Sequence, residues 1–221
     1  MRSTWAYAFL FLAPLALNAS IIFTLGNNPS NDVNILLSSG ATGTTVIGSP
    51  NMSPGVIVDF SSTQSLFEPS SGQARVAANP EGSPLTNLTI SLANGLTYGD
   101  LIINPFIGGL CANCTGGAST ITVRAVSSNG TAEAPAVFTG LTVGNGNNFL
   151  TIVATGGESI VSTTISVAGG FNDLRQPRIS GPFAAAVPES STYLLIGVGL
   201  GLLGFLGRRR LRSGTSTGLP I

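Results

Sequence analysis

The sequence predicts an all-β protein whose main domain is an antiparallel, jelly-roll-like β-sandwich. Apolar and polar residues alternate along several short runs, turn-forming residues separate these runs, and no helical stripe of useful length lies between the two ends of the chain. Alternation with period two is typical of strands that bury one face. Many such strands divided by turns favour a sandwich or barrel, and one domain of this length needs two sheets that cover each other.

Residues 1–20 have the order of a secretory signal peptide. Arg2 carries the positive charge, residues 5–17 form the apolar run, and the small residues Ala19 and Ser20 follow. We therefore predict a cut near Ala19 or Ser20. Export then uses Sec-type machinery and a signal peptidase, and residues 21–181 form the exported β-sandwich.

The clearest alternation marks the central strands of that sandwich. They are expected at 88–92, 121–125, 150–154 and 161–167. Further short strands are expected at 34–37, 44–47, 56–60, 74–77, 98–103, 136–143 and 176–180. Asn-Gly and Gly-Gly pairs stand between them at 94–95, 129–130 and 156–157, and such pairs favour tight turns.

The exported part is poor in charge and slightly acidic. Between residues 21 and 186 it carries four arginines and eight carboxylates, a net charge of −4, and the whole chain contains no lysine and no histidine. No basic cluster is visible in this stretch of the sequence. Nucleic acid is therefore not expected as a partner, because binding to phosphate backbones depends on clustered positive charge.

Cys111 and Cys114 are the only cysteines of the chain. A Cys-x-x-Cys pair is compatible with a redox motif, half of a zinc site or a disulfide that closes a small loop. The zinc site lacks further ligands, and the redox motif lacks its usual strand–helix–strand context. An exported protein reaches an oxidising compartment, so we favour a disulfide between Cys111 and Cys114.

Catalytic chemistry finds little support in the sequence. Without histidine there is no Ser-His-Asp or Cys-His arrangement, and no histidine metal ligand. The scattered acidic candidates for a two-carboxylate hydrolase are Asp59, Glu68, Asp100, Glu133, Glu158 and Asp173. Calcium would suit Asp32, Asp59 or Asp100, but no run of alternating acids is present. We expect no enzyme, no metal and no cofactor.

The end of the chain has three parts in a fixed order. The motif Val187-Pro188-Glu189-Ser190 is followed by an uncharged apolar run over residues 193–207, and then by a basic cluster. The cluster comprises Arg208, Arg209, Arg210 and Arg212. An apolar run that ends in arginines is typical of a membrane span whose basic end stays in the cytoplasm. We therefore predict a single transmembrane helix at about 191–207.

This ending resembles the PEP-CTERM sorting signal of bacteria that make exopolysaccharide, with Ser190 in place of the family's usual second proline. The resemblance implies that residues 188–212 are recognised by an exosortase, which removes the membrane anchor as the protein reaches the surface. Residues 182–187 then form a linker, and residues 213–221 a short polar tail. Residues 148–181 are also similar to the closing strands of other exported proteins with this tail.

The resemblance implies an exported cell-surface or matrix protein. It would be held transiently by membrane lipid, released, and structural or adhesive in an exopolysaccharide or biofilm layer. The alternative is a carbohydrate-binding, lectin-like module of the jelly-roll type. A sugar site usually presents an exposed aromatic ring. The exported part has only Tyr98 and several phenylalanines, because Trp5 lies in the signal peptide, and this disfavours the alternative. A cluster of Tyr98 with Asn and Asp on one concave face would favour it. A two-carboxylate hydrolase is the third hypothesis.

Overall fold

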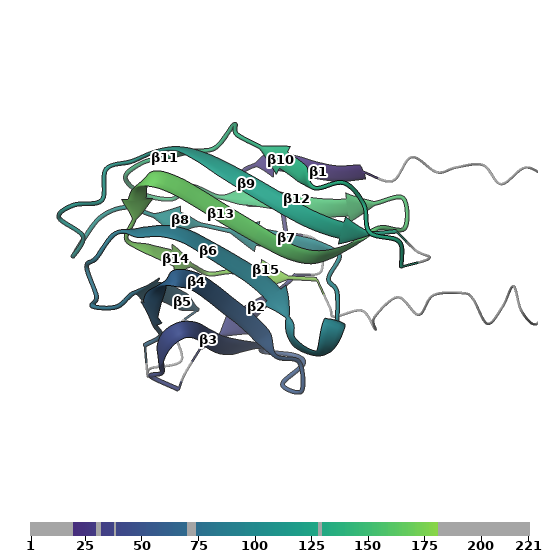
Figure 1. Cartoon of the computed structure of the whole chain (residues 1–221), viewed down its shortest axis with the longest axis horizontal. Helices are drawn as coiled ribbons and strands as arrows, with labels where there is room; N and C mark the ends of the chain where they lie inside the picture. The colour runs from purple at the N-terminus through teal and green to yellow at the C-terminus, as the bar shows by residue number, and fades with distance from the viewer. Residues whose placement is uncertain (1–19, 30–31, 38, 70–73, 128–129, 181–221) are drawn as a thin grey trace, which may run out of the picture.

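The computed structural model describes residues 20–29, 32–37, 39–69, 74–127 and 130–180 (Figure 1). The predicted linker, sorting motif, transmembrane span and polar tail lie outside these residues, and so does the predicted signal peptide up to Ala19. Over the described part of the chain, all elements are β-strands except a short 3-10 turn at Ala93–Gly95. None of the helical structure in that part is long and apolar enough to cross a membrane.

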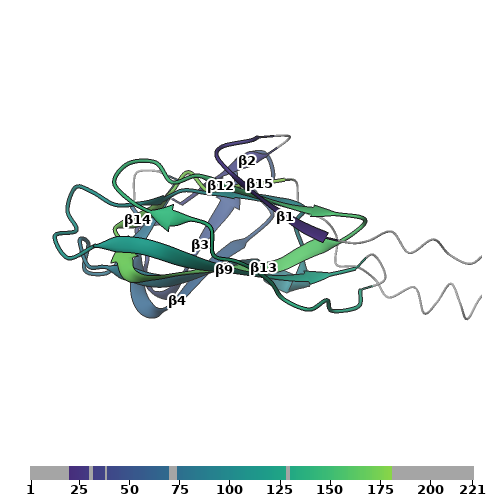
Figure 2. The same ribbon diagram turned by 90° about the horizontal axis from the view of Figure 1, so that it is seen from above.

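The strands form one antiparallel ribbon that folds back on itself into two layers (Figure 2). One layer contains, in spatial order, β3 (Thr42–Pro50), β4 (Val58–Phe67), β6 (Leu85–Leu92), β13 (Ser159–Phe171), β9 (Gly116–Val126) and β10 (Ala136–Phe138). The other contains β1 (Ser20–Leu25), β12 (Leu150–Thr155), β7 (Asp100–Ile103), β15 (Arg178–Ile179) and β2 (Val33–Leu36). The expected all-β class and antiparallel arrangement are confirmed.

Four short strands complete the ribbon. In a small side sheet, β14 (Asp173–Arg175) pairs with both β5 (Arg75–Ala78) and β8 (Pro105–Phe106). The pairing of β5 with the end of β4 ties this side sheet to the first layer. The fourth, β11 (Thr142–Val143), pairs with the start of β9.

Two glycine-containing turns carry the chain from one layer to the other. Asn94 and Gly95 have φ of 59° and 69°, and they lie between β6 and β7. Gly156 and Gly157 have φ of 65° and 87°, and they lie between β12 and β13. Because each turn joins strands of different layers, neither closes a two-stranded hairpin, although their sequences are those of hairpin turns.

The inward-facing residues of the two layers form one hydrophobic core. Large, fully buried members are Phe60, Leu88, Ile90, Ile121, Val123, Ile165, Leu101, Ile103, Leu150, Ile152, Ile35 and Phe171. They occupy alternate positions of their strands, which explains the period-two pattern of the sequence. Burial of each such side chain stabilises the fold by about 1.5–3 kcal/mol.

An aromatic contact joins the two free ends of the ribbon. β1 and β10 are the outermost strands of their layers, and both lie along the same border of the molecule (Figure 1). The rings of Phe23 and Phe138 stack there, with centroids 5.1 Å apart and planes 8° from parallel. Both rings are partly buried and pack against the hydrophobic core.

The expected continuous strand at 136–143 is wrong, because it is divided into β10 and β11. Phe138 pairs with Ile121, and Thr142 pairs with Ala118. The chain therefore advances four residues from β10 to β11 while β9 advances only three. The extra residue interrupts the ladder in the manner of a bulge. The sequence pattern also missed β1, β8 and β14, which are short or lie at an edge.

Candidate functional site

An open cleft lies where β2, β5, β14 and β15 meet, and we call it the arginine cleft. It has a volume of about 510 Å³ and is lined by Asn34, Leu36, Ala74, Arg75, Arg175, Gln176 and Arg178. Three of the four arginines of the described domain thus share one cleft, and only Arg124 lies elsewhere. The fold thus brings together arginines that form no cluster in the sequence.

A buried carboxylate positions two of these arginines. The side chain of Asp173 is fully buried, and its Oδ2 accepts hydrogen bonds from Arg75 Nε at 2.5 Å and Asn172 Nδ2 at 2.9 Å. Arg175 donates from Nε to Oδ1 at 2.8 Å and from Nη2 to Oδ2 at 3.2 Å. A buried charge needs this number of partners, because burial of an unpaired carboxylate is costly.

Each of these two arginines has a second contact. The Nη2 of Arg75 lies 2.7 Å from Oε1 of Glu81. The guanidinium carbon of Arg175 lies 3.5 Å from the centroid of the Phe106 ring, a cation–π contact. The contacts hold both side chains in fixed positions at the wall of the cleft.

Arg178 has a different environment. Its Nε donates to Asn34 Oδ1 at 3.1 Å, and its Nη1 donates to Asn27 Oδ1 at 3.3 Å. Both acceptors are neutral amides, so these contacts orient the guanidinium without neutralising its charge. They also leave part of its fork of N–H donors for another acceptor.

The chain between Arg175 and Arg178 adopts an uncommon conformation. Gln176 has φ of 46°, in the left-handed region that non-glycine residues seldom occupy. Its N–H donates to the carbonyl of Ala74 at 2.6 Å, and the carbonyl of Pro177 accepts from the N–H of Ile35 at 3.0 Å. These bonds tie the segment to neighbouring strands and direct both arginines to the same cleft. Strained conformations of this kind cluster at functional sites.

A second polar surface covers the outer face of the first layer. The strand registers place Thr45, Ser61, Thr89, Thr164 and Thr122 side by side in one row across five strands. Neighbouring strands lie about 4.8 Å apart, and the hydroxyl oxygens of Thr89 and Thr164 are 2.8 Å apart. We call this the hydroxyl row, and it offers uncharged donors and acceptors to water or to sugars.

The structure separates most of the candidate catalytic carboxylates. Asp59 lies on the outer face of β4, Asp100 begins β7, and Asp173 is engaged by two arginines. Glu68 is fully buried, and its Oε1 accepts hydrogen bonds from the backbone and side chain of Ser39. Among the described residues, no group of three or more potential metal ligands of the His, Cys, Asp or Glu type gathers.

Glu133 and Glu158 are the pair that the fold brings together. Both line a cavity of about 210 Å³ near Ile21 of β1. Burial raises the pKa of Glu158, and the charge of Glu133 raises it further. Because the cavity is small and holds no arginine among its lining residues, the pair is a site of electrostatic repulsion rather than a built catalytic site.

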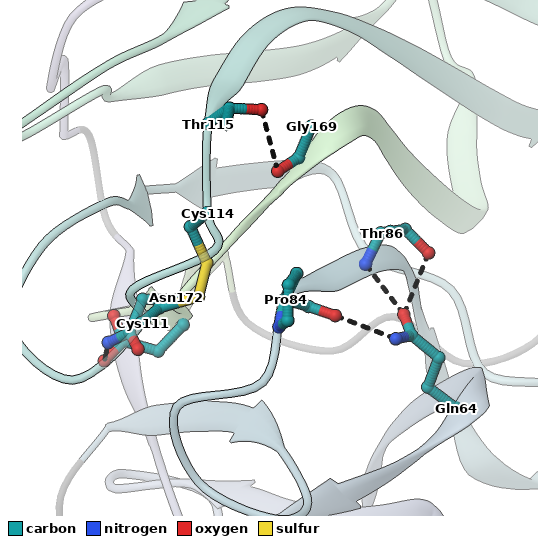
Figure 3. Close-up of a disulfide and its surroundings, with 9 residues drawn as sticks. Gln64, Pro84, Thr86, Cys111, Cys114, Thr115, Gly169 and Asn172 are labelled. Carbon is teal, nitrogen blue, oxygen red and sulfur yellow. Dashed lines mark hydrogen bonds between the residues drawn. A yellow bond between two sulfur atoms is a disulfide. The ribbon is translucent and has the colours of Figure 1, made fainter.

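Cys111 and Cys114 are joined by a disulfide in the loop between β8 and β9, the pairing that the sequence favours (Figure 3). The loop is held close to the end of β13 by the bond from Thr115 N–H to the carbonyl of Gly169, at 2.9 Å. Nearby, the side chain of Gln64 donates to the carbonyl of Pro84, just before β6, and accepts from the N–H of Thr86 in β6 (Figure 3). The disulfide therefore stabilises the corner of the sandwich where this loop meets the end of β13.

The proposed aromatic platform is not available. Tyr98 is fully buried, and its hydroxyl donates to Thr163 Oγ1 at 3.0 Å. Tyr98 is thus a core residue, and it cannot present its ring to a sugar on a concave face. Val187–Ser190 and the arginine cluster at 208–212 lie outside the described residues, so the sorting motif and stop-transfer cluster stay predictions.

Comparisons with known proteins give little further guidance. No protein-family model matches the chain. No curated protein matches it either. Solved structures of family 29 carbohydrate-binding modules are similar in part. One, an alanine variant of CBM29-2, has 10% sequence identity and a TM-score of 0.21, over 78% of this chain and 96% of that chain. A second structure of the family has 10% identity and a TM-score of 0.20, over 77% and 90%. At such TM-scores the likeness establishes neither a common fold nor a common ligand.

Proposed function

We propose that the described domain is a non-catalytic, polysaccharide-binding domain of an exported protein, and that the arginine cleft is its binding site. The observation that carries this proposal is the convergence of Arg75, Arg175 and Arg178 on one open cleft. Arginine side chains donate several hydrogen bonds in a fixed geometry, which suits oxygen-rich ligands. The amides of Asn34 and Gln176 beside them can bind hydroxyl groups.

The contacts of the cleft support binding rather than catalysis. Glycoside hydrolysis uses an acid and a base or nucleophile placed on opposite sides of the scissile bond. Asp173 is the carboxylate that pairs with two of the cleft arginines, and four hydrogen bonds from arginine and asparagine already engage it. Both oxygens of this carboxylate are therefore held by the protein, and they are poorly placed to attack a sugar.

The ends of the chain supply the cellular setting of the proposal. The signal peptide directs the chain across the inner membrane, and residues 188–212 anchor it transiently until an exosortase removes them. The jelly-roll-like sandwich then stays at the cell surface or in the extracellular exopolysaccharide layer. This setting rests on the resemblance of the tail to PEP-CTERM sorting signals.

A purely structural or adhesive role is the second candidate, and the hydroxyl row favours it. A face of threonine and serine hydroxyls hydrates well and forms many weak bonds to sugars without a defined site. The two candidate functions predict different effects of single substitutions on binding. A cleft site is lost by changes at single arginines, whereas a diffuse face is not.

Affinity electrophoresis of the purified full-length chain in mild detergent tests the proposal. Gels contain one acidic or neutral polysaccharide each, and retarded migration is expected with at least one of them. A variant with Arg175→Gln and Arg178→Gln should migrate without retardation. If no polysaccharide retards the wild-type chain, or if reducing ends accumulate during incubation, the proposed function is wrong. If the double variant is retarded as strongly as the wild type, the structural role replaces the cleft site.

A further inference from the structure

We infer that the arginine cleft selects an acidic polysaccharide, and that Arg178 binds the carboxylate of its sugar residues. This inference rests on the proposed function and names the ligand class of the same site. It is carried by the unequal contacts of the three arginines, since two of them are engaged by carboxylates and the third by amides.

The charges of the cleft do not balance. Three arginines line it, and two carboxylates, Asp173 and Glu81, form ion pairs with them. One positive charge is therefore left, and it lies at Arg178, which hydrogen-bonds only neutral oxygens of Asn34 and Asn27 among its described contacts. A ligand with one carboxylate per binding subsite restores the balance.

The orientation of Arg178 suits a carboxylate. Asn34 accepts from Nε and Asn27 accepts from Nη1, so both nitrogens are fixed by the protein before a ligand arrives. The remaining N–H groups include those of Nη2, and neighbouring guanidinium N–H groups bind carboxylates in a two-pronged manner. The preformed geometry reduces the conformational entropy that the side chain loses on binding.

The groups around Arg178 suit a sugar ring more than a phosphate backbone. The exposed side chain of Gln176 and the amide of Asn34 can bind hydroxyls, and Leu36, which is 39% exposed, offers an apolar surface to a ring face. The domain as a whole carries eight carboxylates against four arginines. This excess of negative charge disfavours a polyanion more strongly the more densely it is charged, so it disfavours nucleic acid more than a polysaccharide with at most one carboxylate per sugar.

Three acidic polysaccharides, each compared with its uncharged ester, and two arginine variants test the inference. The ligands are polygalacturonate, alginate and hyaluronate, each beside its carboxyl-esterified form, which keeps the backbone and removes the charge. The variants are Arg178→Gln and, as the control, Arg124→Gln, which changes an exposed arginine of β9 outside the cleft. Dissociation constants are measured on the full-length chain in detergent by calorimetry, at low and at physiological salt.

At least one acid form should bind, and its ester about tenfold or more weakly, because a charge-assisted pair is lost. Arg178→Gln should lower the affinity for the acid by a similar factor, and Arg124→Gln by less than about twofold. An Arg178→Lys variant should recover only part of the affinity, since it keeps the charge and loses the fork. The unfolding temperatures of both Arg178 variants, measured beside that of the wild type, show whether the fold is kept.

The outcomes separate the inference from the proposed function. If acid and ester bind equally well through the cleft, the domain binds polysaccharide but the acidic class is wrong. If neutral polysaccharides alone bind, the same conclusion holds. If none of the polysaccharides binds, both fail. If a DNA oligonucleotide binds as tightly as the best acidic polysaccharide, the inference is overturned and the site is a general polyanion site.

Discussion

Arg75 and Asp173 form the most deeply buried ion pair of the described domain, with Nε 2.5 Å from Oδ2 and no exposed surface on the carboxylate side chain. The two residues are 98 positions apart in the chain. Their pairing joins β5 to β14 and thereby fixes the shape of the cleft wall. The stability of the side sheet and the geometry of the arginine cleft consequently depend on the same contact.

Asp173→Asn should destabilise the protein by about 3–5 kcal/mol, because it leaves the guanidinium groups of Arg75 and Arg175 beside a neutral amide. Urea unfolding followed by circular dichroism measures the change. The matched control is Asp59→Asn on the outer face of β4, for which a change within about 0.5 kcal/mol is expected. Equal effects of the two substitutions would contradict the structural role of the ion pair.

The double substitution Cys111→Ser and Cys114→Ser should cost about 2 kcal/mol of unfolding free energy. The disulfide closes a short loop, with a sequence separation of three, so the entropy that it removes from the unfolded chain is small. The measurement is chemical unfolding of both proteins without reductant. Intact mass after alkylation of the unreduced wild-type chain should show no added label, and two labels would rule out the bond.

Most strands could be predicted from the sequence, because the alternation that marks a strand is local. Leu88, Ile90 and Leu92 all lie on the side of β6 that faces the hydrophobic core, as their spacing indicates. Which strands pair could not be predicted, since pairing is non-local. The alternating runs around Gly156 and Gly157 belong to neighbouring strands that lie in different layers. Phe23 also showed no strand signal of its own, since it lies next to the predicted signal peptide.

The arginine cleft could not be predicted from the sequence for the same physical reason. Arg75 is about a hundred positions from Arg175, so only the pairing of β5 with β14 brings them together. Arg175 and Arg178 are close in sequence, and Gln176-Pro177 between them was a usable sign of a turn. The disulfide was predictable because the two cysteines, and the signal-peptide pattern that predicts an oxidising compartment, both lie in the sequence itself.

Gly169→Ala should destabilise the fold by about 1–3 kcal/mol, since a methyl group there would overlap the side chain of Thr115 and the backbone of Gly116. The backbones of β13 and the disulfide loop approach too closely for a side chain. Gly55→Ala is the control, because a methyl group at that position meets nothing within 4 Å. Thermal unfolding of the two variants checks the difference, and a loss at Gly55 as large as that at Gly169 would contradict the explanation.

Glu158→Gln should stabilise the protein at neutral pH. Burial raises the pKa of Glu158, and the charge of Glu133 adds to the shift, so ionisation of this carboxyl costs stability in the folded state. The stability that the folded protein gains by keeping Glu158 protonated is fully present below the ordinary pKa of glutamate. This stability is lost as the pH rises through the raised pKa of the folded state.

The free energies of unfolding of wild type and Glu158→Gln should therefore be similar at pH 4 and diverge as the pH approaches 7, with the variant more stable. Urea titrations across this range provide the measurement. Glu133→Gln removes one cause of the shift and should give a smaller difference of the same sign. A wild type that gains stability relative to Glu158→Gln with rising pH would show that the carboxylate is stabilising instead.

The last prediction concerns the ends of the mature protein. Strand β1 begins at Ser20, and Phe23 within it stacks on Phe138. A cut after Ala19 keeps the whole of β1, whereas a cut after Ser20 removes its first residue, so of the two predicted positions we now expect the cut after Ala19. At the other end, the resemblance to PEP-CTERM signals predicts a cut close to Pro188, with loss of residues 208–212.

Intact mass of the protein recovered from the cell surface tests both cuts, in the native host and in a strain without exosortase. The native strain should give a chain that lacks both predicted hydrophobic segments, and the deletion strain one that keeps its arginine-rich end. An identical mass in the two strains, with the arginines retained, would mean that the anchor is permanent. In that case the domain would bind polysaccharide while fixed to the membrane, and the arginine cleft would link the cell to its surrounding layer rather than contribute to the layer itself.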